Sequence, residues 1–407
     1  MTSQTLSASR ERWLLLTLAG IQFTHILDFM IMMPLGPQFR EIFGIADAQF
    51  GLLVSAYTLA AGVSGLAAST YVDRFDRKRL LLSMYGLFAL ATLACGLAPT
   101  YEFLMGARLA AGLFGGVLSA LSQTIVADVV PFERRGRAMA VVMSSFSFST
   151  VAGVPLGLVL ANHLGWHATF VAIALLSGVL VVAAMLTMPP LHAHVAAARG
   201  RSAWTGIRQV LADANHLRAF AFSLAMMSTG FLVIPYITLY MRANVGLSVD
   251  DIPFIYFVGG AATLVSARWV GRLSDRRGKV AVFSVLALAL AVPLLGLTVL
   301  PAWPLPAVLV VSTLLFVVMS GRMIPGMALV ASAANPAVRG TFMALNSAVQ
   351  STAMGVAAFV GGQLISRGEG GVVLGYWQAG VVGCVSSVLS IWLARRLVLH
   401  GAAPPRI

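Results

Sequence analysis

The chain alternates long apolar runs with short polar segments, and the length of these runs indicates its fold class. A helix needs roughly 20 predominantly apolar residues to cross a bilayer. Twelve runs are long enough: 13–37, 48–71, 79–98, 101–127, 137–161, 166–188, 218–242, 251–271, 279–300, 305–332, 340–365 and 372–394. Several contain Gly or Pro, which membrane helices tolerate. The pattern predicts an all-α integral membrane protein with twelve transmembrane helices.

One long polar interval, residues 189–217, separates the first six runs from the last six, and polar landmarks recur in both sets. Asp73 and Asp275 are 202 residues apart, and Gly136 and Gly340 are 204 apart. Two landmarks at nearly one offset indicate a duplicated unit. We therefore expect two pseudo-symmetric six-helix bundles around a central cavity. The predicted divisions are an N-terminal segment 1–12, a first bundle 13–188, a linker 189–217, a second bundle 218–397 and a tail 398–407.

Composition supports a membrane protein, and the distribution of charge predicts its orientation. Of all residues, 59% are hydrophobic and 10% are charged, against about 25% charged in soluble domains. With the first segment inside, 21 of the 27 Lys and Arg residues are cytoplasmic. Three fall on the opposite face, at Arg40, Arg242 and Arg367, and three fall within runs. This bias explains the net charge of +13 without a nucleic-acid partner and predicts that both termini are cytoplasmic.

The N-terminal apolar run resembles a signal peptide in having Arg10 and Arg12 just before it. It is longer than a signal sequence, however, and no A-x-A cleavage site closes it. We therefore expect the first span to be retained.

The stretch "FTHILDFMIMMPLGP", residues 23–37, places an acidic residue, Asp28, deep inside the first run. A charge at the centre of a membrane helix costs roughly 2.5–3.5 kcal/mol. Gln22, His25 and Asp28 recur every three residues and form one polar stripe. A carboxyl removed from water can load and release a proton near neutral pH. Asp28 is thus a candidate proton carrier or substrate ligand, or else a structural partner of His25 or of a polar group on a neighbouring helix. His25 could itself relay protons or only hold Asp28 in position.

Arg268 is close enough to the cytoplasmic end of the eighth run to snorkel, but the other two arginines within runs lie deeper, Arg108 in the fourth and Arg322 in the tenth. Because Arg keeps its proton, each must face a cavity or pair with a dipole or carboxylate. Arg108 could control the proton affinity of Asp28 or contact substrate. Arg322 could bind an anionic substrate group, snorkel or pair structurally. Two amides of the eleventh run, Asn346 and Gln350, need partners and are weaker candidates for substrate contacts.

The fifth run contains Gly153, Pro155 and Gly157, which allow close helix packing and a bend. We expect a packing seam here, with some effect on conformational exchange; a hinge in this helix is the alternative.

Two polar loops carry a resemblance to a known family. "GRLSDRRGK" matches the G-x-x-x-D-R-x-G-[RK] loop of the major facilitator superfamily at Gly271, Asp275, Arg276, Gly278 and Lys279. The first-half copy, "STYVDRFDRKR", keeps a smaller set: Asp73, Arg74, Arg77 and Lys78. The resemblance covers essentially the whole chain. It implies transport by alternating access, with these loops acting as gating clamps between helices as well as fixing topology.

Within that superfamily the chain resembles the bacterial drug and sugar efflux permeases of the drug:proton antiporter branch. Arg108 and Gly112 match an intramembrane R-x-x-x-G motif, and "GVPLG", residues 153–157, is similar to permeases of the arabinose-export type. The resemblance implies proton-coupled export of a small amphipathic molecule by a monomer in a bacterial inner membrane. The alternatives are an uptake uniporter or proton symporter and, as a weaker one, a non-transporting scaffold or sensor. No Walker loop, G-x-S-x-G or metal-ligand cluster occurs, so we expect neither an enzyme nor a cofactor, with a proton gradient as the energy source.

Overall fold

The computed structural model describes residues 8–71, 75–130, 132–189 and 203–400. Within these ranges, twelve helical segments are long and apolar enough to cross a membrane, and each corresponds to one predicted run. The predicted all-α membrane fold is therefore confirmed.

In the described residues, the first half of the chain forms nine α-helices. They are α1 (Ala8–Ile31), α2 (Gly36–Phe43), α3 (Asp47–Tyr71), α4 (Arg77–Gly96), α5 (Tyr101–Gly115), α6 (Leu118–Val129), α7 (Phe132–Phe148), α8 (Val154–Leu164) and α9 (Trp166–Thr187). The α5–α6 and α7–α8 pairs each make one span.

The second half repeats this plan and adds a small hairpin. Its helices are α11 (Ala203–Ala212), α12 (Ala214–Phe231), α13 (Ile237–Tyr240), α14 (Ile252–Arg277), α15 (Lys279–Ala289), α16 (Ala291–Thr298), α17 (Leu305–Ala333), α18 (Arg339–Gln363) and α19 (Tyr376–Ala394). The antiparallel strands β1 (Ser366–Arg367) and β2 (Val373–Leu374) precede α19.

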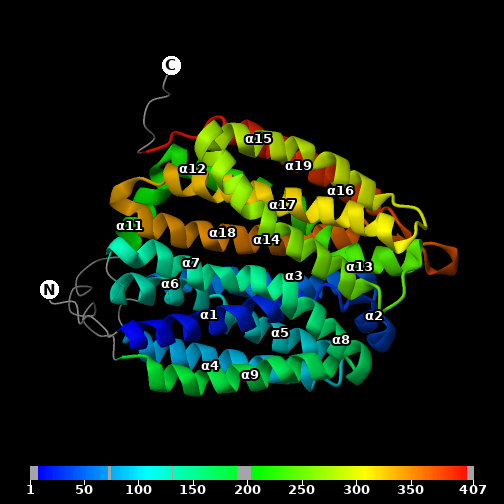
Figure 1. Cartoon of the computed structure of the whole chain (residues 1–407), viewed down its shortest axis with the longest axis horizontal. Helices are drawn as coiled ribbons and strands as arrows, with labels where there is room; N and C mark the ends of the chain where they lie inside the picture. Colours follow the sequence, from blue (N-terminus) through cyan, green and yellow to red (C-terminus); the bar gives the residue numbers. More distant parts are fainter. Residues whose placement is uncertain (1–7, 72–74, 131, 190–202, 401–407) are drawn as a thin grey trace.

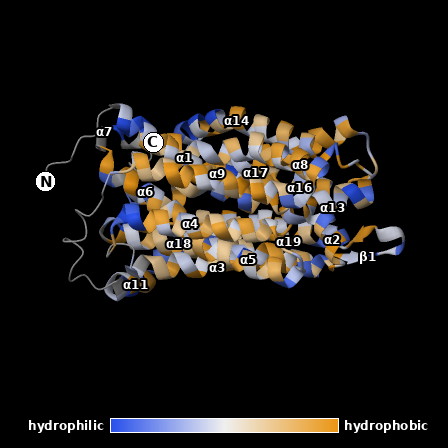
Figure 2. Ribbon diagram, turned by 90° about the horizontal axis from the view of Figure 1, so that it is seen from below, coloured by the Kyte–Doolittle hydropathy of each residue, from blue (hydrophilic) through white to orange (hydrophobic). Residues whose placement is uncertain are grey.

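The two halves lie side by side as elongated bundles (Figure 1). The start of α1 and the end of α19 lie at one end, which we call the termini end (Figure 1). Helix α2, helix α13 and the β1–β2 hairpin lie at the other, the hairpin end (Figure 1). Hydrophobic residues cover the length of the bundles and hydrophilic residues gather toward the two ends (Figure 2). Lipid must cover a surface of this kind, so the long axis crosses the membrane.

Small residues allow the two halves to approach closely along α3 and α18. A Cβ added at Gly355 would lie 2.7 Å from Oγ1 of Thr58, and one added at Gly62 would lie 2.9 Å from Oγ1 of Thr352. Ser55 uses this proximity, because its hydroxyl donates a 2.6 Å hydrogen bond to the carbonyl of Gly355. Small residues at helix crossings are the usual means of close packing in membranes.

Three polar connections between the halves lie toward the hairpin end. Arg367 pairs with Asp47, Asn162 donates a 3.1 Å hydrogen bond to the carbonyl of Val249, and Ser55 bonds Gly355. Ser55 is eight residues into α3, or about 12 Å from its start at the hairpin end. The halves are thus tied together at the hairpin end.

Prolines interrupt two spans that the apolar pattern predicted as continuous. The first was expected over 13–37, but α1 ends at Ile31 and α2 is a separate helix. Pro34 and Pro37 lack the backbone N–H that a continuing helix needs. In the seventh span, α12 ends at Phe231 and a short 3-10 helix with Pro235 follows. Both breaks lie toward the hairpin end.

The predicted packing seam of the fifth span lies against α1. Residues Ser149–Gly153 form a π-helix just before Pro155, and such a turn accommodates the missing donor. A Cβ at Gly153 would lie 3.0 Å from Leu27, and one at Gly157 would lie 2.9 Å from Ile31. These glycines pack the span tightly on α1, and a hinge role stays a prediction.

Part of the predicted linker, and part of the predicted tail, pack on the second bundle. Helix α11 lies within 189–217, with Val210 buried, and α12 begins at Ala214 rather than at 218. Asn215 accepts a 2.9 Å hydrogen bond from the N–H of Val398, and His400 donates a 2.7 Å bond to Ser332. The domain boundaries themselves stay a prediction.

Candidate functional site

Asp28 and Arg108 form a fully buried ion pair within the first bundle. Nη1 of Arg108 lies 2.8 Å from Oδ2 of Asp28 and also donates to its backbone carbonyl at 3.3 Å. Asp28 is in the last turn of α1, and Arg108 is seven residues into α5. Since α5 starts at the hairpin end, the pair lies about 10 Å along it. The two charges that the sequence singled out separately are therefore direct partners.

Aromatic side chains enclose the pair. The guanidinium of Arg108 lies over the ring of Tyr57, with Cζ 4.5 Å from the ring centroid. The ring centroid of His25 lies 6.1 Å from that of Tyr57 and 5.8 Å from that of Phe88. The cation–π contact and the carboxylate together hold the guanidinium in place.

The ion pair leaves much hydrogen-bonding capacity unused. Several buried polar atoms in and around the pair make no hydrogen bond within the described residues: Oδ1 of Asp28, Nε and Nη2 of Arg108, both ring nitrogens of His25, and the hydroxyls of Tyr57 and Thr92. Buried polar groups are almost always hydrogen-bonded, so such a cluster is unusual. It indicates a place where a proton, water or substrate group can be received.

His25 does not hold Asp28 in position, which corrects one of the roles considered for it. Neither ring nitrogen makes a hydrogen bond among the described residues. Gln22, in contrast, is partnered, because its amide lies 3.2 Å from the hydroxyl of Ser119 in α6. The polar stripe on α1 thus faces α3 to α6 within its own bundle.

Glycines on α5 set the position of Arg108. A Cβ at Gly112 would collide with the backbone carbonyl of Tyr57, and one at Gly115 would lie 2.7 Å from the hydroxyl of Tyr57 and 2.9 Å from the ring of His25. Gly112 belongs to the R-x-x-x-G motif in the sequence. Its physical role is to let α5 approach α3 closely enough for Arg108 to lie over Tyr57.

Replacing Gly112 by Ala is expected to lower the free energy of unfolding by about 3 kcal/mol, because backbone, not a flexible side chain, blocks the added methyl group. Gly106→Ala on the same helix is the matched control, since nothing lies within 4 Å of its added Cβ. Unfolding of both variants can be followed by circular dichroism in detergent. Equal stability of the two variants would contradict the close approach of α5 and α3.

The second-half candidates form a separate group. Arg322 is buried in α17 and donates a 2.7 Å hydrogen bond to the carbonyl of Met226 in α12, while its Nε and Nη1 make no hydrogen bond. No carboxylate of the described residues pairs with it. Asn346 accepts a 2.6 Å bond from Ser223, and Gln350 lies 3.4 Å from the sulfur of Met327. The structure does not join these residues to the Asp28 pair.

The predicted gating loops have different surroundings in the two halves. Asp73 and Arg74 lie outside the described residues. Arg77 pairs with Asp128 at 2.6 Å, which links α4 to α6 within the first bundle. In the second-half loop, Asp275 and Arg276 are exposed and Gly271 is half-buried. Gly278, with φ +88°, makes the turn between α14 and α15.

Sequence reasoning missed the ion pair that joins the halves. Arg367 contacts both carboxylate oxygens of Asp47, at 2.8 and 2.9 Å, and Arg40 lies 3.1 Å from the same carboxylate. Asp47 is the first residue of α3 and lies just outside the predicted run 48–71. The available signal was that Arg40 and Arg367 are two of just three basic residues predicted on that face.

Known proteins resemble this chain over most of its length. A chloramphenicol resistance protein of Streptomyces lividans is 27% identical over 392 residues, which cover 93% of this chain and 94% of that protein. The uncharacterized MFS-type transporter YbcL of Bacillus subtilis is 25% identical over 268 residues, 65% of this chain and 67% of YbcL.

Solved transporters share the fold. A bacterial homolog of the human lysosomal transporter Spinster, in an inward-facing and occupied conformation, superposes with a TM-score of 0.77 at 16% identity, covering 98% of this chain and 100% of that one. A D-xylose–proton symporter superposes with a TM-score of 0.76 at 16% identity, covering 94% and 97%. The sequence model of the Major Facilitator Superfamily matches residues 18–358 and 219–405. This chain therefore belongs to the Major Facilitator Superfamily.

Proposed function

We propose that this transporter is a proton-coupled antiporter that exports a small amphipathic molecule by alternating access. The observation that supports this most is the buried Asp28–Arg108 pair, surrounded by polar atoms that lack hydrogen bonds. Intramembrane ionisable residues of this kind mark substrate or proton pathways by default. The proton gradient would supply the energy, with no cofactor, and the working unit would be a monomer in a bacterial inner membrane.

The pair offers a direct way to exchange a proton for a substrate. Oδ1 of the ionised Asp28 makes no hydrogen bond and can accept one from a polar group of the substrate, while the unbonded Nε and Nη2 of Arg108 can donate to it. A proton on the Asp28 carboxyl competes for the same place, since a neutral carboxyl is a much weaker acceptor than a carboxylate. Proton binding therefore releases the substrate, and departure of the proton allows the next substrate to bind. Mutually exclusive occupancy of this kind is antiport.

The contacts between the halves support an alternating cycle. The distribution of basic residues favours a cytoplasmic position for the termini end, and the hairpin end would then face outward. The connections at Asp47–Arg367 and Ser55–Gly355 then close the outer side. Export requires a second state in which these connections break, and an ion pair that breaks and re-forms is a suitable two-state element.

The relative from Streptomyces lividans makes chloramphenicol the first substrate to test. Chloramphenicol is neutral and amphipathic, which suits a site where one ion pair lies among apolar and aromatic side chains. Uptake of an anionic metabolite is the second candidate, because Arg322 is a buried cation without a carboxylate partner. The two functions differ in direction and in the charge of the substrate.

The test uses inverted membrane vesicles that contain the protein and a pH-sensitive dye. After respiration acidifies the vesicle interior, chloramphenicol and a panel of lipophilic cations, sugars and anionic metabolites are added one at a time. Antiport predicts that a substrate releases interior protons in vesicles with the protein and not in matched vesicles without it. Raised drug tolerance on overexpression would agree with export. Growth on a sole carbon source, without proton release by any drug, would contradict export and favour uptake.

A further inference from the structure

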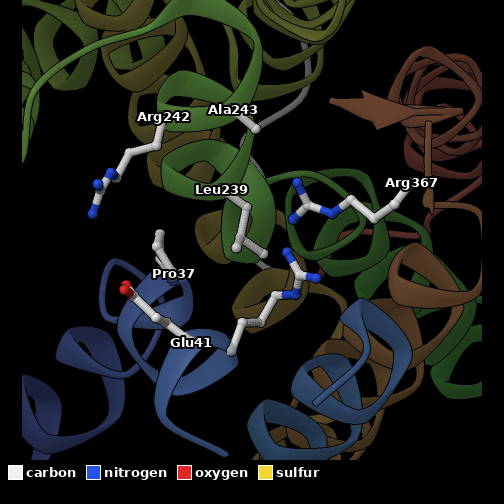
Figure 3. Close-up of a pocket in the computed structure, with 7 residues that line it drawn as sticks. Pro37, Glu41, Leu239, Arg242, Ala243 and Arg367 are labelled. Carbon is white, nitrogen blue, oxygen red and sulfur yellow. The ribbon is translucent and has the colours of Figure 1, made fainter. Parts of the chain in front are cut away.

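The three arginines that the described chain carries at the hairpin end all line one cavity. Arg40 is on α2, Arg242 follows α13, and Arg367 is on β1. The cavity has a volume of about 310 Å³ and is completed by Glu41 and by the apolar side chains of Pro37 and Leu239 (Figure 3). Its size falls at the lower end of small-ligand pockets, roughly 300–1,000 Å³. The arginines come from both halves of the chain and from positions more than 100 residues apart.

The three arginines lie at an end of the molecule whose other charged residues are acidic. Six carboxylates lie on the segments that form the hairpin end: Glu41, Asp47, Glu102, Asp250, Asp251 and Glu369. Three arginines could each be neutralised by a separate carboxylate. Instead, Arg40 and Arg367 share Asp47, while Arg242 forms no ion pair or hydrogen bond within the described residues. The cavity therefore has more cationic donors than acceptors.

The arrangement of the hydrogen-bond donors in the cavity favours binding of an anion. Nε of Arg40 is divided between Asp47 at 3.1 Å and the carbonyl of Ile45 at 3.2 Å. Burial and the nearby charge of Arg367 lower the pKa of Arg40, against the opposing effect of Asp47. Two guanidinium groups held this close repel each other, and an added negative charge relieves that repulsion. Guanidinium forks match the oxygens of carboxylates and phosphates.

We propose that this cavity binds an anionic group, a carboxylate or a phosphate, at Arg40 and Arg367, and that Arg242, whose guanidinium points away from Arg367 in Figure 3, turns toward the bound anion as a third donor. A bound anion competes with Asp47 for two of these arginines. It thereby weakens the ion pair that ties the two halves at the hairpin end, and so favours opening of that end. The anion could belong to a free small molecule or to a lipid headgroup. The proposal does not depend on proton coupling at Asp28, so either can fail without the other.

The first test measures binding of citrate and of inorganic phosphate to the purified full-length protein in neutral detergent by calorimetry. Ionic strength is held constant with sodium chloride, because exposed charges are screened by salt. We expect saturable binding of at least one probe. Arg242→Gln should weaken it roughly tenfold, the typical effect of removing one charge-assisted hydrogen bond. Arg242 makes no hydrogen bond or ion pair within the described residues, so its replacement by Gln breaks none and the variant is expected to fold.

Variants that are expected to tighten binding test whether the anion binds in this cavity. Asp47→Asn removes the competing carboxylate, and Glu41→Gln removes the acidic side chain that lines the cavity, so both should tighten binding. Arg272→Gln, an exposed arginine of α14 at the other end of the molecule, is the matched control and should leave it unchanged. Absence of saturable binding of either probe in both wild type and Asp47→Asn would overturn the proposal. Equal affinity in wild type and Arg242→Gln would do so as well.

A second arm identifies the source of the anion. The protein is reconstituted in nanodiscs of phosphatidylcholine alone and of phosphatidylcholine with phosphatidylglycerol. If phosphatidylglycerol abolishes citrate binding in wild type and has no such effect on Arg242→Gln, the site belongs to lipid headgroups. Equal citrate binding in both membranes would assign it to a free anion.

Discussion

Replacing Asp28 by Asn is expected to abolish substrate-driven proton release in inverted vesicles. Asn has nearly the same shape as Asp but cannot take up a proton, so a transporter that uses this carboxyl loses its coupling. Substrate exchange without a gradient should persist, because Arg108 remains available to the substrate. Comparing proton release with exchange of labelled substrate separates the two effects. A variant that releases protons as wild type does would show that Asp28 is structural.

Stability provides the control for this prediction. Asp28→Asn leaves Arg108 as a buried charge without its partner, which typically costs about 3–5 kcal/mol. The double variant Asp28→Asn with Arg108→Gln removes both charges and should recover most of that loss, since the two residues are in direct contact. If the pair were only structural, the double variant would recover transport together with stability. We expect stability to return and proton coupling to remain absent.

The fold could be predicted because its physical determinant is local. Each span is a run of apolar residues long enough to cross a bilayer, and run length can be read without knowing any contact. The breaks after Ile31 and Phe231 were harder, since prolines within membrane spans are tolerated in some helices and end others. The outcome depends on whether neighbouring helices satisfy the freed backbone groups. That information is tertiary.

The charged residues of the site could be predicted from the sequence, but the residues that surround them could not. Asp28 and Arg108 stood out because each is costly within a membrane. The roles of Tyr57 and Gly115 depend on the crossing of α3 and α5, which no short sequence pattern specifies. The ion pair between the halves was missed for a related reason. Resemblance directed attention to the loops of the termini end, whereas Asp47, Arg40 and Arg367 come from three separate segments at the hairpin end.

Arg322 raises the question of why a buried cation has no counter-ion. In both halves, an arginine from the fourth span donates to a backbone carbonyl of the first span, Arg108 to Asp28 and Arg322 to Met226. The first half adds a carboxylate and the second does not. Within the described residues, Arg322 otherwise donates only a long 3.8 Å contact to the sulfur of Met319, and a buried charge with so few acceptors is costly, so Arg322 lowers the stability of the empty protein. A group that is kept at such a cost is a good candidate for a ligand contact.

Replacing Arg322 by Met is therefore expected to raise the free energy of unfolding by about 1–4 kcal/mol while it abolishes transport. Met has a similar length and fills the space without a charge. Arg108→Met is the matched control and should have the opposite effect on stability, because it leaves Asp28 buried and unpaired. Thermal unfolding in detergent and vesicle transport can be measured on the same preparations. Destabilisation by Arg322→Met equal to that by Arg108→Met would make Arg322 a structural residue, and a stabilised variant with normal transport would exclude it from the substrate site.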